Sequence, residues 1–274
     1  MLKKTFQEVK EKTPLVHCIT NYVTVNDCAN SLLACGGSPI MADDIGEVEE
    51  IISICNSLCI NIGTLNERSI LSMLAAGKRA NELSYPVVLD PVGAGASTLR
   101  TATAFKLIKQ VKFSVIRGNI SEIKTVAQGA GTTKGVDADA SDAVTGENLE
   151  DTIAFAKKLS EKTQSVIAIT GAIDIVADSH KAYVISNGNA LMSKVSGTGC
   201  MLSAIIAAFC GANPTAILDA TAAAVCFMGL CGELAFDRLA LMGGGTSTYR
   251  TLLIDFMSQV SPDILEGGAK IETR

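Results

Sequence analysis

Short apolar runs alternate along this chain with longer segments in which apolar residues recur every three or four positions. The short runs are rich in β-branched residues, and Val166-Ile167-Ala168-Ile169 is continuously apolar, as strands buried on both faces are. These runs predict strands at Leu15–Ile19, Leu58–Ile62, Pro86–Asp90, Ser114–Arg117, Ser165–Thr170, Ile173–Ala177 and Ala182–Ile185.

The longer segments have the spacing of amphipathic or buried helices. They predict helices near Val25–Cys35, Glu47–Cys55, Asn66–Leu83, Thr101–Val111, Glu147–Glu161, Gly199–Cys210, Ala216–Phe236 and Tyr249–Gln259. Because strands and helices alternate, we predict an α/β fold with a mostly parallel central sheet and helices on both faces. The short turn at Gly171-Ala172 predicts a hairpin at one end of that sheet.

One domain over residues 1–274 is expected, because no Pro/Ser-rich linker, tandem repeat or low-complexity segment divides the chain. Gln128–Gly146 is interpreted as one surface loop, with or without a short helix. The apolar stretches Met201–Ala212 and Ala220–Gly232 are shorter than the roughly 20 residues that cross a bilayer. Both are interpreted as buried helices, and no membrane span is predicted.

Composition narrows the expected location and partner. A net charge of −5 without a Lys/Arg cluster, and the absence of Trp, argue against nucleic-acid binding. The charged N-terminus lacks the apolar region of a signal peptide, and none of the nine cysteines forms a Cys-x-x-Cys pair. This pattern favours a reducing cytoplasm over a disulfide framework. We therefore expect a cytoplasmic protein whose partner is a small molecule.

Polar residues follow several predicted strands, at the edge where parallel sheets bind ligands. Asp90 ends one strand and is followed by Pro91-Val92-Gly93-Ala94-Gly95. Its carboxylate there could hold a hard cation or the water around it. The alternative is a side chain that only caps the turn.

A second strand end carries Arg117, Gly118, Asn119 and, three residues later, Glu122. An Arg can clamp phosphate oxygens, and Glu122 could order the water of a Mg²⁺ ion. The alternative is a capping box, with Asn119 at the N-cap and Glu122 at the third helical position.

The turn Ser196-Gly197-Thr198-Gly199-Cys200 leads into a predicted helix. Its glycines leave successive backbone N–H groups able to point at one anion, where the helix dipole adds positive charge. It has neither Walker A spacing nor a dinucleotide fingerprint. Cys200 in the first helical turn is expected to have a lowered pKa, and the alternative is a small residue packed at a helix start.

Weaker candidates surround these three. The Thr170 hydroxyl ends a strand and could meet a nucleotide phosphate, although a plain turn explains it equally well. The run Gly243–Thr248 could line the nucleotide site, although we interpret it as a connection. Asn21 can donate and accept hydrogen bonds to a heterocycle, and Met41 offers a soft apolar wall, although both also suit a core.

Together these segments resemble the hydroxyethylthiazole kinase family of thiamine salvage, within the ribokinase-like superfamily. The resemblance runs over almost the whole chain. It is carried by PLVHCITNYVTVNDCAN, GGSPIMADD with EVEE, LDPVGAG, IRGNISEI, ITG and SGTGC.

This resemblance implies a three-layer α/β/α fold and ATP- and Mg²⁺-dependent phosphorylation of 4-methyl-5-(2-hydroxyethyl)thiazole. It also implies homotrimers with the thiazole site between subunits. The residue roles that it implies are thiazole contacts from Asn21, Val23, Met41 and Gly197, ATP contacts from Arg117, Asn119 and Thr170, Mg²⁺ organisation by Asp90 and Glu122, an anion cradle at Gly197, Thr198 and Gly199, and Cys200 where the alcohol meets the γ-phosphate.

Two departures from relatives bear on these expectations. Cys200 stands where many ribokinase-like sugar kinases have an Asp base, and Gly245-Thr246-Ser247 replaces a Gly-Pro-Gly loop. Two alternatives to a thiazole kinase remain open. One is a related kinase for a hydroxymethylpyrimidine or a sugar, and the other is a nucleotide-binding sensor without catalysis.

Overall fold

The computed structural model describes residues 1–128 and 144–274, and most of the predicted surface loop falls outside these residues. Within them one sheet runs in the order β2-β1-β3-β4-β5-β6-β7-β8-β9. Its strands are β1 (Leu15–Ile19), β2 (Ser38–Ile40), β3 (Ser57–Asn61), β4 (Val87–Asp90), β5 (Val115–Gly118), β6 (Val166–Ile169), β7 (Asp174–Ala177), β8 (Ala182–Ile185) and β9 (Ile271–Thr273).

The sheet has a parallel and an antiparallel part. From β2 to β6 every neighbouring pair is parallel, whereas β6–β7, β7–β8 and β8–β9 are antiparallel. The predicted mostly parallel sheet is confirmed, and so is the hairpin at Gly171-Ala172, which joins β6 to β7.

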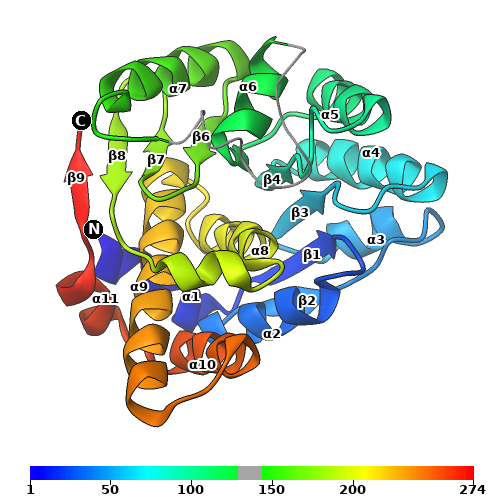
Figure 1. Ribbon diagram of the computed structural model, residues 1–274. Helices are drawn as coiled ribbons and strands as arrows, with labels where there is room; N and C mark the ends of the chain where they lie inside the picture. Colours follow the sequence, from blue (N-terminus) through cyan, green and yellow to red (C-terminus); the bar gives the residue numbers. More distant parts are fainter. Residues whose placement is uncertain (129–143) are drawn as a thin grey trace.

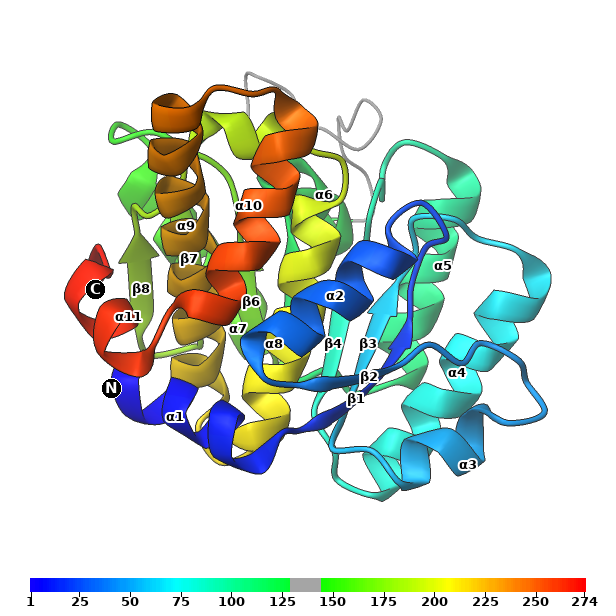
Figure 2. The ribbon, with the colours of Figure 1, turned by 90° about the horizontal axis from the view of Figure 1, so that it is seen from below.

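Helices cover both faces of the sheet (Figures 1 and 2), so the α/β/α architecture is confirmed. On one face α8 and α9 pack against the strands, with α1, α2 and α10 beside them, and α4, α6 and α7 pack on the other. The helices are α1 (Leu2–Lys12), α2 (Val25–Cys35), α3 (Val48–Ser53), α4 (Glu67–Glu82), α5 (Thr98–Gln110), α6 (Ile120–Gln128), α7 (Leu149–Thr163), the 3₁₀ helix η2 (Ala190–Lys194), α8 (Thr198–Ala212), α9 (Ile217–Met242), α10 (Thr246–Gln259) and α11 (Pro262–Gly268).

Successive residues of a strand serve two separate cores. In β4, Val88 belongs to the core on the α8/α9 side, whereas Val87 and Leu89 belong to the core on the other side. This alternation follows from the strand period of two. It explains why the middle positions of these parallel strands are mostly apolar on both faces.

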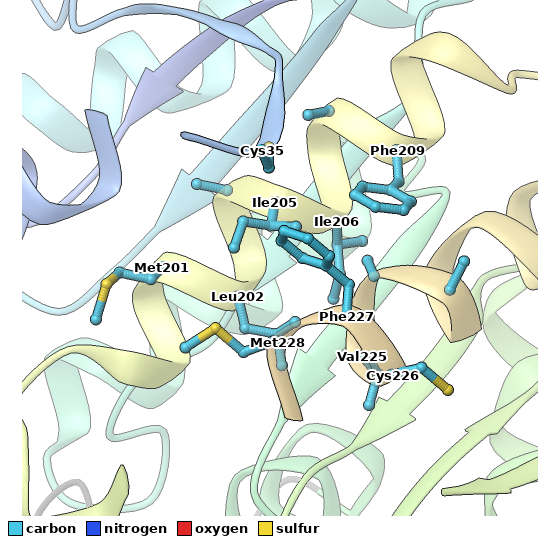
Figure 3. Close-up of a cluster of buried hydrophobic side chains, with 14 of the residues drawn as sticks. Cys35, Met201, Leu202, Ile205, Ile206, Phe209, Val225, Cys226, Phe227 and Met228 are labelled. Carbon is cyan, nitrogen blue, oxygen red and sulfur yellow. The ribbon is translucent and has the colours of Figure 1, made fainter. Parts of the chain in front are cut away.

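The contact between α8 and α9 forms the centre of the first core (Figure 3). Phe209 of α8 and Phe227 of α9 lie with ring centroids 5.8 Å apart, and Phe6 of α1 packs against both. Aromatic pairs at such distances stabilise a core beyond the area that they bury. The apolar run after Gly199 therefore forms a helix, α8, that is buried on nearly all sides. This packing holds the N-terminus of α8 against the sheet.

α9 is longer than predicted, because it continues past Phe236 to Met242. Within the described residues it is the one helix long and apolar enough to cross a bilayer. However, 72% of its most apolar window is buried inside the molecule, which is the environment of a core helix.

Candidate active site

The parallel strands end at one edge of the sheet, and the predicted site residues of these strands gather there. Asn21 follows β1, Asp90 ends β4, Arg117 lies in β5 and Thr170 follows β6. The N-terminus of α8 reaches the same edge, because Gly199 lies against Arg117 and Ser203 bonds to Asp90. The register of the parallel strands therefore brings together residues far apart in the sequence.

Asp90 is fully buried, and only one of its carboxylate oxygens has a partner. Oδ2 accepts hydrogen bonds from Asn61 Nδ2 at 2.8 Å and Ser203 Oγ at 2.9 Å, and Arg117 Nη1 lies 3.5 Å away. Oδ1 is buried and has no partner among the described residues. Burial raises the pKa of this carboxyl, although the charge of Arg117 opposes the rise.

Arg117 lies between the ends of β4 and β6 and the first turn of α8. Its Nη2 donates to Thr170 Oγ1 at 2.6 Å. A Cβ on Gly199 would lie only 2.5 Å from Nη1, so the guanidinium packs directly on the α8 backbone. The side chain is largely buried, and Nε has no partner in the described part of the chain. A cation held this way strengthens the positive end of the helix.

Glu122 joins the end of β5 to the turn after β4. Its Oε1 accepts from Gly93 N at 2.8 Å and its Oε2 from Asn119 N at 2.9 Å, while Asn119 Oδ1 accepts from Glu122 N. The capping box is therefore present. Burial, together with the negative charge of Asp90, raises the pKa of Glu122 to about 7. The carboxylate both caps α6 and lies near Asp90, so the two interpretations are compatible.

The turn before α8 depends on glycine at two positions. Gly197 has φ +87°, in the left-handed region, and a Cβ there would collide with Thr24 Cγ2. Gly199 allows the close approach of Arg117 described above. The amides of Thr198, Gly199 and Cys200 open a 15-residue helix, and the first amides of a helix have no intrahelical acceptor. An anion at this turn would meet backbone donors and Arg117 together.

Cys200 is half-buried, and its sulfur accepts a hydrogen bond from Asn21 Nδ2 at 3.2 Å. The expected lowering of its pKa is wrong. Burial of the thiol and, after it, the negative charge of Asp90 raise its pKa to about 11. Desolvation outweighs the hydrogen bond from Thr24 and the positive charge of Arg117, which lower the pKa, because a thiolate loses its hydration when it is covered.

The predicted substrate residues occupy different environments. Asn21 is buried beside Cys200, and Met41 is half-buried at the edge of the first core. A bond of 2.8 Å between His17 Nε2 and Ala42 O anchors the chain just after Met41. Val23 is 62% exposed and Tyr22 79%, so the segment from Asn21 to Val23 runs from the buried site to the surface.

Three further residues complete this edge and were missed from the sequence: Asn61, Ser203 and Thr24. Asn61 bonds to both Asp90 and Asn21, and Thr24 donates to Asn21 Oδ1. Asn61 could have been found, because it is a polar residue near the end of a predicted buried strand, as Asp90 is. The role of Thr24 depends on a turn contact with Gly197 that no spacing reveals.

Other features lie apart from this edge. A surface cavity of about 520 Å³ borders the opposite ends of the strands, where Ser114, Ser165 and Val166 begin β5 and β6. No group of three or more His, Cys, Asp or Glu side chains in the described residues could hold a metal ion. A metal here would have to rest on two carboxylates, with waters and a bound phosphate completing its shell.

Comparison with known proteins agrees with this geometry. The model of the hydroxyethylthiazole kinase family matches residues 6–263. The chain is 61% identical to the hydroxyethylthiazole kinase of Clostridium acetobutylicum, with 100% of both chains covered. The solved hydroxyethylthiazole kinase of Pyrococcus horikoshii superposes with a TM-score of 0.88 at 32% identity, covering 100% of this chain and 98% of that one. A ribokinase-like protein of Enterococcus faecalis, with a TM-score of 0.59 at 14% identity over 95% of this chain and 89% of its own, shares the fold.

Proposed function

This chain belongs to the hydroxyethylthiazole kinase family, and from that premise we propose that the edge around Asp90, Arg117 and the α8 N-terminus carries its reaction. The reaction is transfer of the γ-phosphoryl group of ATP to the hydroxyl of 4-methyl-5-(2-hydroxyethyl)thiazole, as in thiamine salvage. The observation that supports this site best is the packing of the Arg117 guanidinium on Gly199. It places a fixed cation beside backbone donors, where transferring phosphate gains most from preorganised charge.

Arg117, Asn119 and Thr170 form the nucleotide side. Arg117 and the Thr170 hydroxyl are already bonded to each other, so both face one site. The guanidinium supplies several donors in a rigid fork that suits phosphate oxygens. Asn119 holds Glu122 at the start of α6 through the capping box.

Asp90 and Glu122 suit a magnesium ion. The buried, unpartnered Oδ1 of Asp90 is a hard oxygen donor, and Mg²⁺ is commonly bound by one or two carboxylates plus substrate phosphates. When bound, Mg²⁺ would neutralise charge on the phosphates. This chain's own part is to hold Oδ1 toward the site while three groups occupy Oδ2.

On the acceptor side, Asn21, Val23, Met41 and Gly197 would contact the thiazole. Cys200 would orient the hydroxyl, because a thiol whose pKa is raised to about 11 is almost fully protonated at neutral pH and is a poor base. Phosphoryl transfer has a loose transition state, so positioning matters more than early removal of the hydroxyl proton. The amides of Gly197, Thr198 and Gly199 would stabilise the transferring group.

The protein would act in the cytoplasm as one kinase domain over residues 1–274, in homotrimers with the thiazole site between subunits. The exposure of Tyr22 and Val23 next to buried Asn21 supports a site that a second subunit completes. Sedimentation of the purified protein tests this assembly, and a monomer at micromolar concentration would contradict it.

ADP release measured with a panel of alcohols tests the function. The thiazole alcohol should give ATP- and Mg²⁺-dependent turnover with the highest kcat/KM, and mass spectrometry should show the phosphorylated thiazole. A higher kcat/KM with a hydroxymethylpyrimidine or a sugar would identify a related kinase. ATP binding without turnover on any alcohol would identify a nucleotide sensor.

A further inference from the structure

Asn61 lies between the two halves of the proposed site and bonds to both. Its Nδ2 donates to Asp90 Oδ2 at 2.8 Å, and its Oδ1 accepts from Asn21 Nδ2 at 3.0 Å. The side chain is 1% exposed. β3, which carries it, is flanked by β1 and β4, so the position is in the middle of the strand ends that build the site.

The orientation of both amides follows from their backbone partners. Asn61 Oδ1 also accepts from Gly63 N at 2.9 Å, and Asn21 Oδ1 accepts from Thr24 N at 3.1 Å. A backbone N–H can only donate, so these atoms are the oxygens and each Nδ2 points the other way. Asn61 therefore donates toward Asp90, and Asn21 donates toward both Asn61 and Cys200.

These bonds form one connected chain, which we call the relay: Asn21 donates to both Cys200 and Asn61, and Asn61 donates to Asp90. Gly63 closes over it, because a Cβ there would lie 2.9 Å from Asn61 Oδ1 and 3.0 Å from Asn21 Cβ. No side chain larger than hydrogen fits without moving the two amides. Hydrogen bonds in a buried network are electrostatically stronger than in water, so these bonds hold the two amides in one orientation.

The relay acts on Asp90 in a specific way. Oδ2 is contacted by Asn61, Ser203 and Arg117. Oδ1 has no partner within residues 1–128 and 144–274, although Asp90 is 0% exposed. Three partners on one oxygen fix the rotation of the carboxylate about its axis. A buried carboxylate oxygen without a partner is costly, so its lone pairs favour a ligand that reaches it when the site is occupied.

We propose that Asn61 is a positioning residue that couples the alcohol side of the site to the phosphate side. It holds the Asn21 amide against the Cys200 sulfur and turns Asp90 Oδ1 toward the phosphates. The inference rests on the proposed kinase function for its kinetic readout. Ser203 addresses the same Asp90 oxygen but its other bond is to Gly199 O, so it tests the Asp90 half alone.

Four variants separate the two halves of the relay. Asn61→Asp keeps an acceptor for Asn21 and Gly63 but loses the donor to Asp90, Asn61→Ala loses both, and Ser203→Ala loses one donor to Asp90. Ser57→Ala is the matched control, because Ser57 starts the same strand, is fully buried and donates only to Ala207 O in α8.

Steady-state kinetics and calorimetry of thiazole binding without nucleotide or metal give the first test. Loss of an outer partner of a ligating carboxylate commonly costs about 10- to 100-fold in activity, so kcat should fall about 100-fold in Asn61→Asp and about 10-fold in Ser203→Ala. The thiazole Kd should stay within about threefold in these two but rise about tenfold in Asn61→Ala, which is one lost buried hydrogen bond. Ser57→Ala should keep the wild-type kcat and Kd.

A wild-type kcat in Asn61→Asp, an unchanged thiazole Kd in Asn61→Ala, or equal losses in Ser57→Ala would overturn the coupling. If the wild type itself fails to phosphorylate the thiazole, the proposed function is wrong, and the relay is then judged by a crystal structure of Asn61→Ala. We expect the Asn21 amide to leave Cys200 and the Asp90 carboxylate to rotate. Unmoved Asn21 and Asp90 side chains would overturn the relay whatever the substrate.

Discussion

Two glycine-rich turns in this molecule lead into helices, and only one of them has the surroundings of a phosphate site. At Gly197–Gly199 a Cβ would collide with Thr24 or lie 2.5 Å from Arg117. At Gly243–Gly245 neither the first nor the last glycine has a neighbour within 4 Å of an added Cβ. The second turn is exposed and follows Leu241 and Met242, which are exposed too.

The difference shows that glycine spacing before a helix is not sufficient for a site. Both helices offer unpaired amides at their N-termini. Of these two helices, α8 is the one that starts beside Asp90 and Arg117, at the carboxyl ends of the parallel strands. The function therefore depends on what the glycines allow to come close.

The substitution expected to have the largest effect on activity is Gly199→Ala, in the turn before α8. Its methyl group would push the guanidinium of Arg117 away from the α8 backbone, and loss of one preorganised charge in such a site costs about 100-fold in kcat. We expect that loss in kcat/KM for ATP. Gly245→Ala is the control, since nothing lies near its Cβ and its φ is −117°. Equal losses in the two variants would contradict the comparison.

Cys200→Ala should lower kcat by about 10-fold, which corresponds to one lost orienting contact of about 1.4 kcal/mol, while Kd for ATP stays within about twofold. The reason is that Cys200 bonds to Asn21 on the acceptor side. Cys200→Ser, which keeps a polar group there, should lose less. Unchanged turnover in Cys200→Ala would remove this residue from the chemistry.

Gly197→Ala should destabilise the fold by about 2–3 kcal/mol, because left-handed backbone disfavours a Cβ by 1–2 kcal/mol and the new atom meets Thr24. Gly36→Ala is the control: its φ is +102° and ψ 9°, and the atom nearest its Cβ would be Cδ of the flexible Lys10 side chain at 3.0 Å, with Lys10 Cα at an ordinary contact distance of 3.6 Å. Urea unfolding should show a larger loss for Gly197→Ala. Adding Thr24→Ser, which removes Cγ2, should recover part of it, and no recovery would exclude the contact as the cause.

The reaction of Cys200 with iodoacetamide tests the protonation state of its thiol without any substitution. Thiolate is the reactive form, and the pKa of this thiol is raised to about 11. The alkylation rate, followed by peptide mass spectrometry, should therefore rise about tenfold per pH unit from pH 7 to pH 10. The other eight cysteines are buried and should react more slowly. A plateau near pH 7 would mean a low pKa and would restore Cys200 as a base.

The parallel strands β1, β3, β4, β5 and β6 were predicted well because each contains a short, mostly apolar run. Sequence-based prediction missed β2 and β9, which have three residues each, and β2 contains Pro39. It also missed α1, because the many charged residues of this segment made the pattern of its four buried side chains hard to recognise. α9 was placed too short because its last turns, from Asp237 to Met242, are mostly exposed and lie outside the core. Short edge strands and partly exposed helix ends contain too few regularly spaced apolar residues to be predicted from the sequence.

Part of the candidate site could be predicted from polar residues at strand ends, as at Asp90 and Arg117, and from Glu122 in the first turn of the following helix. The direction of the Cys200 pKa could not be predicted, because it depends on burial and on Asp90, 110 positions away. The relay through Asn61 likewise needs the register of three strands. Sequence spacing identifies which residues reach the edge, whereas their mutual contacts arise only when the sheet forms.

The central claim is that the α8 turn, and not the α10 turn, holds the transferring phosphate. A crystal structure with the thiazole alcohol, Mg²⁺ and a non-hydrolysable ATP analogue tests it most directly. We expect the γ-phosphate on the amides of Gly197–Cys200, within hydrogen-bond distance of Arg117 and facing the thiazole hydroxyl. A γ-phosphate at Gly243–Gly245, or one more than 6 Å from the α8 amides (about two hydrogen-bond lengths), would contradict the account.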